Sequence, residues 1–247
     1  MKKGFSPSEA ISYGWETFKK NVWLFVVLAI LSSAISSISN IFTPEKSNAY
    51  LVVVSQIIAF VLSILLSVGV TKIALRIYDG EKARLGEVFH YSRYGVKYFV
   101  VSILMALIVI LGLVTPIISG VIWAIRVGGK EVKKNGWYFV ALLLAPWLVW
   151  AIQFSYAYYF IIDKDAKIVE SLVKSSALTK QAKLDLVAFG VLQVFVMLVG
   201  FLCLFVGIFA AIPVLWISEV YVYRKLLEQT KFEEKKKIDT TEAEAAA

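Results

Sequence analysis

The sequence has few of the side chains that most catalytic and metal sites use. Of its 247 residues, one is a cysteine (Cys203) and one is a histidine (His90). A lone cysteine excludes an internal disulfide and a cysteine-based metal site. The sequence also has no H-E-x-x-H, G-x-S-x-G, G-x-x-x-x-G-K-S/T or G-x-G-x-x-G motif, which excludes the commonest zinc, serine, P-loop and dinucleotide chemistries. We therefore expect a non-catalytic protein without a metal or cofactor; an intramembrane enzyme is the third interpretation.

Charge is also missing from five long tracts. Hydrophobic residues make up 59% of the chain and charged residues 18%, and the mean hydropathy is +0.75. A bilayer core about 30 Å thick requires roughly 20 apolar residues per helix, and a charge at its centre costs at least about 2.5 kcal/mol. The five tracts together contain one formal charge, Glu219; they are residues 22–43, 50–71, 98–125, 138–162 and 186–223. The pattern predicts an all-α, polytopic membrane protein.

The lengths of these tracts predict about six transmembrane helices. The last tract would be about 57 Å long as one helix at 1.5 Å per residue, so we expect two spans with a tight turn near Gly200–Gly207. The third tract, Val101–Ile125, is long and contains Pro116 and Gly120. We favour one long, tilted span there; the alternative is a segment that turns back near residues 115–120.

Three amphipathic segments precede spans, and lysine and arginine cluster beside them. These segments begin near Ser6, Leu85 and Asp165, and each should form a helix in the membrane interface; Ser6 and Glu9 suit a capping box. Basic residues are rich before the first span and after the second, which by the positive-inside rule predicts cytoplasmic termini at the cell membrane. Because the basic residues are dispersed, we expect anionic lipid headgroups as partners, not nucleic acid. Residues 1–226 form the predicted membrane domain, and 227–247 a charged, disordered cytoplasmic tail.

One stretch resembles a known prokaryotic group. A proline-containing helix that ends at an aspartate is followed by an amphipathic helix and a span, with Pro146, Asp163, Ser175, Leu178, Thr179 and Lys180 at the motif positions. This pattern is similar to the integral membrane proteins related to the membrane domain of glycerophosphoryl diester phosphodiesterase and to the DUF975 and YciC-like families. The resemblance implies a six-span fold and no reaction. Gln181 stands where that group usually has glycine.

Polar residues inside the tracts are the candidates for a binding site. Glu219 is the only acid in them, and we expect it to pair with Arg224 or a tyrosine hydroxyl, with a role in transport as the alternative. Asp163 and Asp165 are predicted to cap a helix start. The first span carries Ser32, Ser33, Ser36, Ser37, Ser39 and Asn40, the second Gln56, Ser63 and Ser67, and later spans Gln153 and Gln193.

These polar stripes fit two arrangements. In the first, the polar side chains form hydrogen bonds between packed helices, which average about 0.6 kcal/mol each in membranes. In the second, they line a polar cavity. The leading interpretation is a non-catalytic multi-pass membrane protein that organises lipid or membrane-protein partners through its interfacial helices. The alternative is a small transporter or lipid-handling carrier with a polar intramembrane cavity.

Overall fold

The computed structural model describes residues 5–41, 48–82, 85–88, 90–127, 150–203 and 206–245, and these ranges are almost entirely helical, with no strand among them. Within them, Ala49–Tyr78, Ser92–Gly112, Lys183–Leu202 and Gly207–Phe232 are long and apolar enough to cross a membrane, and a bent pair, Pro7–Lys20 with Val22–Ile38, would be a fifth. The prediction of an all-α polytopic membrane protein is confirmed. Residues 138–149 of the predicted span at 138–162 lie outside the described residues.

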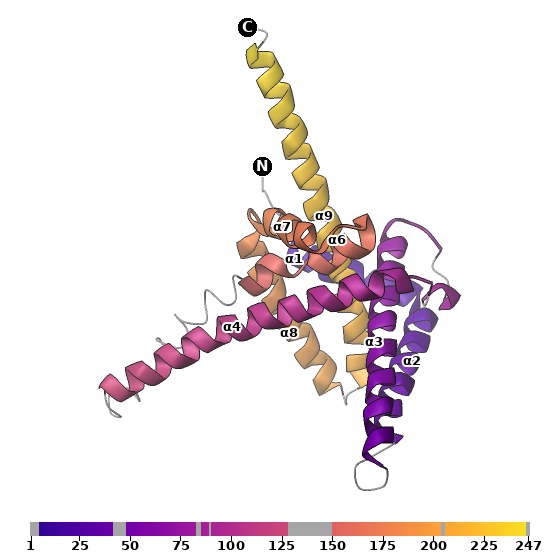
Figure 1. Cartoon of the computed structure of the whole chain (residues 1–247). Helices are drawn as coiled ribbons and strands as arrows, with labels where there is room; N and C mark the ends of the chain where they lie inside the picture. The colour runs from indigo at the N-terminus through magenta and orange to yellow at the C-terminus, as the bar shows by residue number, and fades with distance from the viewer. Residues whose placement is uncertain are drawn as a thin grey trace.

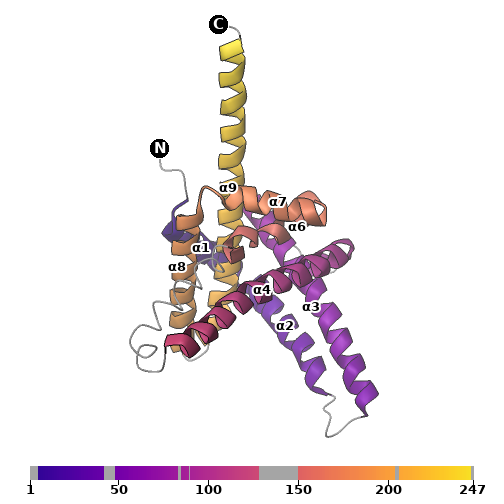
Figure 2. The same ribbon diagram turned by 60° about the vertical axis from the view of Figure 1, so that its left-hand side comes forward.

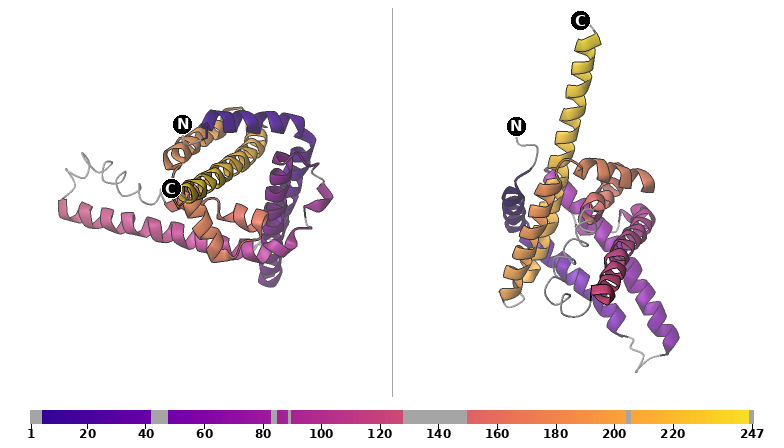
Figure 3. Two further views of the ribbon diagram at one scale, coloured as in Figure 1. Left: turned by 90° about the horizontal axis from the view of Figure 1, so that it is seen from above. Right: turned by 90° about the vertical axis from the view of Figure 1, so that its left-hand side faces the viewer.

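Two helical hairpins point the same way from a layer of shorter helices (Figures 1 and 2). The hairpins are α2–α3 and α8–α9, and the layer contains α1, α6 and α7. Seen from above, α9 lies between α1 and α4, with α2 and α3 at one side (Figure 3). The elements are α1 Pro7–Lys20, α2 Val22–Ile41, α3 Ala49–Tyr78, the 3-10 turns η1 Leu85–Glu87 and η2 Ser92–Tyr94, α4 Gly95–Val127, α6 Ala157–Lys164, α7 Ile168–Thr179, α8 Lys183–Leu202 and α9 Val206–Ala245.

Helix α1 meets α2 at an angle of 90° around Asn21. Asn21 stabilises the elbow, because its side-chain amide donates to the Thr17 carbonyl at 2.9 Å. The predicted capping box does not form at the start of α1: Ser6 makes no side-chain cap bond, and Glu9 accepts instead from the Tyr221 hydroxyl at 2.5 Å. Glu9 therefore fixes α1 to α9 instead of closing its own helix.

The segment after α3 is not the amphipathic helix that its spacing predicted. Two 3-10 turns, η1 and η2, occupy it. Arg76 bonds both Glu81 and Glu87, and Val88 is buried against Gly69, where a Cβ would overlap the Val88 carbonyl. These tertiary contacts bend the chain back onto α3, so the helical periodicity of residues 85–96 is overridden.

Helix α4 runs without a break from Gly95 to Val127. Its 33 residues correspond to a length of about 50 Å, and it crosses α3 at a large angle (Figure 1). The alternative in which residues 115–120 turn back is therefore wrong, and the segment is one long helix, of which Ser92–Gly112 is apolar enough to cross a membrane.

The α8–α9 hairpin has the tight turn predicted for it. Helix α8 ends at Leu202 and α9 begins at Val206. A Cβ on Gly207 would lie 2.6 Å from the Gly200 carbonyl oxygen, so two glycines permit the close approach.

Helix α9 continues to Ala245 as a helical arm beyond the layer (Figure 1). The sequence predicted disorder for residues 227–247, and the structure differs from that prediction over the described part of this segment. Lysine, glutamate and alanine, which are abundant here, are among the strongest helix formers. This composition accounts for a helix that extends past the apolar part of α9.

Candidate polar cavity and its supporting contacts

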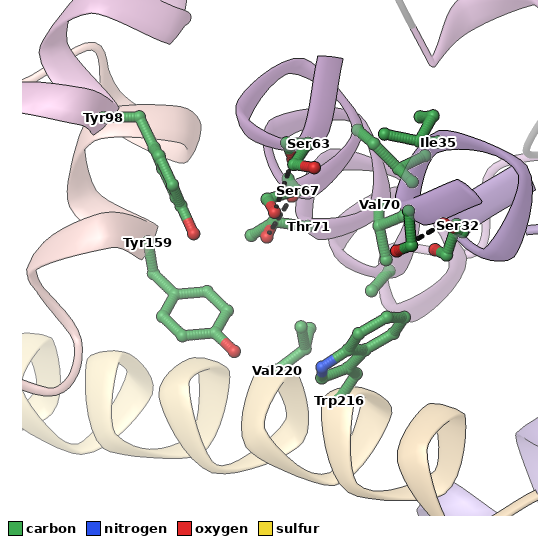
Figure 4. Close-up of a pocket in the computed structure, with 13 residues that line it drawn as sticks. Ser32, Ile35, Ser63, Ser67, Val70, Thr71, Tyr98, Tyr159, Trp216 and Val220 are labelled. Atoms are coloured by element: carbon green, nitrogen blue, oxygen red, sulfur yellow. Dashed lines mark hydrogen bonds between the residues drawn. The ribbon is translucent and has the colours of Figure 1, made fainter. Parts of the chain in front are cut away.

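A cavity of about 310 Å³ lies among α2, α3, α4, α6 and α9 (Figure 4). This volume is at the lower end of the range for small-molecule sites. Its polar lining is Ser32, Ser36, Ser63, Ser67, Thr71, Tyr98, Tyr159 and Trp216; its apolar lining is Ile35, Leu66, Val70, Ala74 and Val220. Ser32 and Ser36 of the first predicted span and Ser63 and Ser67 of the second thus line a common cavity, whereas Ser33, Ser37 and Gln56 do not line it.

Four hydroxyls on α2 and α3 make the same kind of hydrogen bond. Each of four donates to the backbone carbonyl one turn earlier: Ser36 to Ser32 at 3.0 Å, Ser63 to Ala59 at 2.7 Å, Ser67 to Ser63 at 2.8 Å and Thr71 to Ser67 at 2.8 Å. A hydroxyl has one proton and two lone pairs. Because the proton is used within the helix, these oxygens are left to act as acceptors.

Aromatic side chains form the opposite wall. Tyr98 from α4, Tyr159 from α6 and Trp216 from α9 face the α3 hydroxyls across the cavity (Figure 4). Aromatic rings carry a negative electrostatic potential on their faces and a positive one at their edges. The cavity therefore joins an acceptor-rich wall to an aromatic one.

Glu219 lies behind the aromatic wall. It accepts a hydrogen bond from the Tyr159 hydroxyl at 2.9 Å and another from the Gln193 side-chain amide at 3.1 Å. The predicted pairing with a tyrosine hydroxyl is the one observed, and Arg224 bonds elsewhere. Tyr159 thus connects the one intramembrane acid, on α9, and Gln193, on α8, to the cavity.

The remaining polar candidates lie apart from this site. Gln56 is exposed on α3, and Gln153 donates to Ser176 at 2.5 Å. The side chain of Asn40 and all of Pro146 lie outside the described residues. The sequence alone did not identify Thr71, Tyr98, Tyr159 or Trp216 as site residues. Their contribution depends on how α4, α6 and α9 converge, which no local pattern reports.

The motif residues of α7 have a structural role. The Ser175 hydroxyl accepts from the Tyr156 backbone N–H at 3.2 Å and donates to the Gln153 carbonyl at 2.9 Å. These two bonds satisfy backbone groups at the break before α6. Leu178 and Thr179 are buried beside Ser175, while Lys180 is exposed. The hydroxyl side chains of Ser171, Ser175 and Thr179 thus face the protein.

A cluster of charges links the ends of α3 and α6 to the middle of α9; we call Arg224, Asp163 and Asp79 the Arg224 clasp. Arg224 binds both oxygens of Asp163, at 2.8 and 3.0 Å, and one oxygen of Asp79 at 2.5 Å. The Asp163 side chain is 6% exposed.

Asp163 lies at the end of α6, not at a helix start, and Asp165 pairs with Lys97, so the prediction that both cap a helix start is wrong. The reason is that α6 stops before Asp165, which adopts a left-handed conformation with φ of 50°.

The Arg224 clasp predicts acid sensitivity. Burial by itself would raise the pKa of Asp163, but the hydrogen bonds and charge of Arg224, with Lys164, outweigh it and lower that pKa. A carboxyl whose folded pKa is depressed stabilises the fold above its unfolded pKa of about 3.9, and the contribution is lost as pH falls through the lower folded value. We expect the thermal midpoint of detergent-solubilised protein to fall below about pH 4. Asp163→Asn should start lower at pH 7 and show a smaller further drop; an identical acid profile would contradict this role.

No protein-family model matches this chain, and comparisons with curated proteins and with solved structures gave no match either.

Proposed function

We propose that this protein is a non-catalytic membrane protein that binds a small polar molecule or a lipid headgroup in the cavity. The observation that supports this most is the convergence of hydroxyls from α2 and α3 with Tyr98, Tyr159 and Trp216 around about 310 Å³. Polar groups are costly in hydrocarbon unless they have partners. Acceptors that face a cavity inside the bilayer are therefore expected to meet a ligand or water.

This proposal favours the carrier or lipid-handling alternative. We place the protein in the cell membrane with both termini in the cytoplasm. We also relate it to the prokaryotic six-span group that the α7 motif resembles. In this orientation α1, α6 and α7 lie at the cytoplasmic surface, and the α2–α3 and α8–α9 hairpins extend into the bilayer.

A second function, membrane organisation, is supported by a separate observation. Val169 and Val173 are 71% and 62% exposed on α7, and Trp15 is 48% exposed on α1. Both helices lie in the layer beside the hairpins (Figure 2). Apolar side chains in that layer suit insertion among lipid headgroups, preferably anionic ones, or contact with a membrane-protein partner.

Filling the cavity tests the first proposal. Ser67→Leu places a larger apolar side chain in the lining, whereas Ser37→Leu makes the same change on an exposed face of α2. We expect native mass spectrometry of purified wild-type protein and of Ser37→Leu to show a bound lipid or metabolite at defined stoichiometry, and Ser67→Leu to lose it. Equal retention in both variants would contradict ligand binding in the cavity.

A further inference from the structure

We propose that the cavity recognises an ammonium group: its ligand is an organic cation, either a free amine or a lipid with an amine headgroup. This inference rests on the proposed function, which it makes specific. The cavity joins several hydrogen-bond acceptors, three aromatic rings and a nearby carboxyl group, and each of these favours a positively charged donor.

The lining offers acceptors and no positive charge. Ser63 and Thr71 donate their protons to carbonyls of their own helix, so the lone pairs of their oxygens are available to a ligand. None of the residues that line the cavity is a lysine or arginine. Lys72, next to Thr71, directs its ammonium to the Ile162 carbonyl at 3.4 Å. A phosphate or carboxylate would find no cation there.

The aromatic wall suits the same ligand. Tyr98, Tyr159 and Trp216 surround the space opposite the hydroxyls (Figure 4). A cation within about 6 Å of an aromatic face is attracted to it, most strongly by tryptophan, and the attraction grows when water is excluded. The Tyr159 hydroxyl donates to Glu219, and the other donors in this wall, the Tyr98 hydroxyl and the Trp216 indole N–H, carry no net charge.

Glu219 places a carboxyl group on the aromatic side of the cavity. Both of its oxygens accept hydrogen bonds from neutral groups, Tyr159 and Gln193, and an ammonium ligand nearby would favour its ionised form. Its charge reaches the cavity through Tyr159, whose hydroxyl is polarised by the bond. Glu219 therefore favours a cation in the cavity without touching it.

The test compares three ligands that each have six carbon atoms. Wild-type protein in an uncharged detergent is titrated with hexylamine hydrochloride, sodium hexanoate and hexanol by calorimetry. We expect hexylammonium to bind at least about tenfold more tightly than the other two, a difference of about 1.4 kcal/mol. Equal binding of all three would overturn the ammonium inference but leave the cavity as a site. Binding of none would overturn the proposed function as well.

Variants then test which residues make the cavity prefer hexylammonium over hexanol. Glu219→Gln should lower hexylammonium affinity about tenfold and leave hexanol affinity unchanged; Tyr159→Phe should act in the same direction. Glu228→Gln, an exposed acid further along α9, is the matched control and should have no effect. Unchanged hexylammonium affinity in both cavity variants would overturn the role of Glu219, and the wild-type comparison stays decisive if a variant fails to fold.

Two bilayers distinguish the source of the ammonium group. Hexylammonium affinity is measured in nanodiscs of phosphatidylethanolamine and of phosphatidylglycerol, in high salt that screens surface charge. Weaker apparent affinity in phosphatidylethanolamine alone would identify the lipid headgroup as a competing occupant. Equal affinity in the two bilayers would identify a free amine as the ligand. Either result supports recognition of an ammonium group.

Discussion

Arg224→Ala is expected to destabilise the protein by about 3 to 5 kcal/mol, the cost of leaving a buried charge without its partner. Arg224 is 13% exposed and bonds both oxygens of Asp163, which is 6% exposed. Its second partner, Asp79, joins the end of α3 to the same point. Removing the guanidinium releases the ends of α3 and α6 from α9 at once. The free energy of unfolding, measured by titrating sodium dodecyl sulfate into mild detergent, reports the loss.

The neighbouring residue provides the control for this prediction. Lys225 is 38% exposed and pairs with the exposed Glu228 at 3.5 Å, so Lys225→Ala should change stability by less than about 1 kcal/mol. Asp163→Asn combined with Arg224→Ala should cost less than the sum of the single changes, because the two groups are coupled. Equal, small effects of Arg224→Ala and Lys225→Ala would contradict the importance of the Arg224 clasp.

Gly14→Val is expected to separate α1 from α9, at a cost of about 1 to 3 kcal/mol or more. A Cβ on Gly14 would overlap the Ser218 hydroxyl and the Val214 carbonyl. The carbonyl belongs to the helix backbone, which cannot rotate away as a side chain does. We expect lower stability in the same titration, with faster proteolysis of the N-terminal helix.

A glycine in open space is the matched control for Gly14→Val. Gly190 in α8 has nothing within 4 Å of a Cβ, so Gly190→Val should be nearly neutral. Gly14→Val combined with Ser218→Gly should recover only part of the loss, because the Val214 carbonyl still obstructs. Similar stabilities for the Gly14 and Gly190 variants would show that α1 is not held by this close approach.

The fold was largely predictable because membrane helices are determined by composition. Long uncharged tracts exclude other structures, since only helices satisfy backbone groups within one apolar segment. The α8–α9 turn followed from length and from Gly200 and Gly207. The segment at 85–96 could not be predicted locally, because Arg76, from the preceding helix, and the contact of Gly69 with Val88 decide it.

The site was predictable in part for a similar reason. Serine stripes on two adjacent spans and the lone Glu219 are visible in the sequence. The aromatic wall is not, because Tyr98, Tyr159 and Trp216 resemble the aromatic residues common at membrane interfaces. Asp79 also gave no signal, since its partner Arg224 is distant in sequence and the pairing depends on how α3 and α9 pack.

The central claim is that Ser67 faces a polar cavity within the membrane. In a Cys203→Ser background, Ser67→Cys is compared with Val61→Cys, which replaces a 48% exposed residue of the same helix. A charged, water-soluble methanethiosulfonate is added to proteoliposomes; it reacts with thiolates, which form in water and not in hydrocarbon. We predict rapid labelling of Ser67→Cys and none of Val61→Cys. A Ser67→Cys variant as unreactive as Val61→Cys would contradict the cavity.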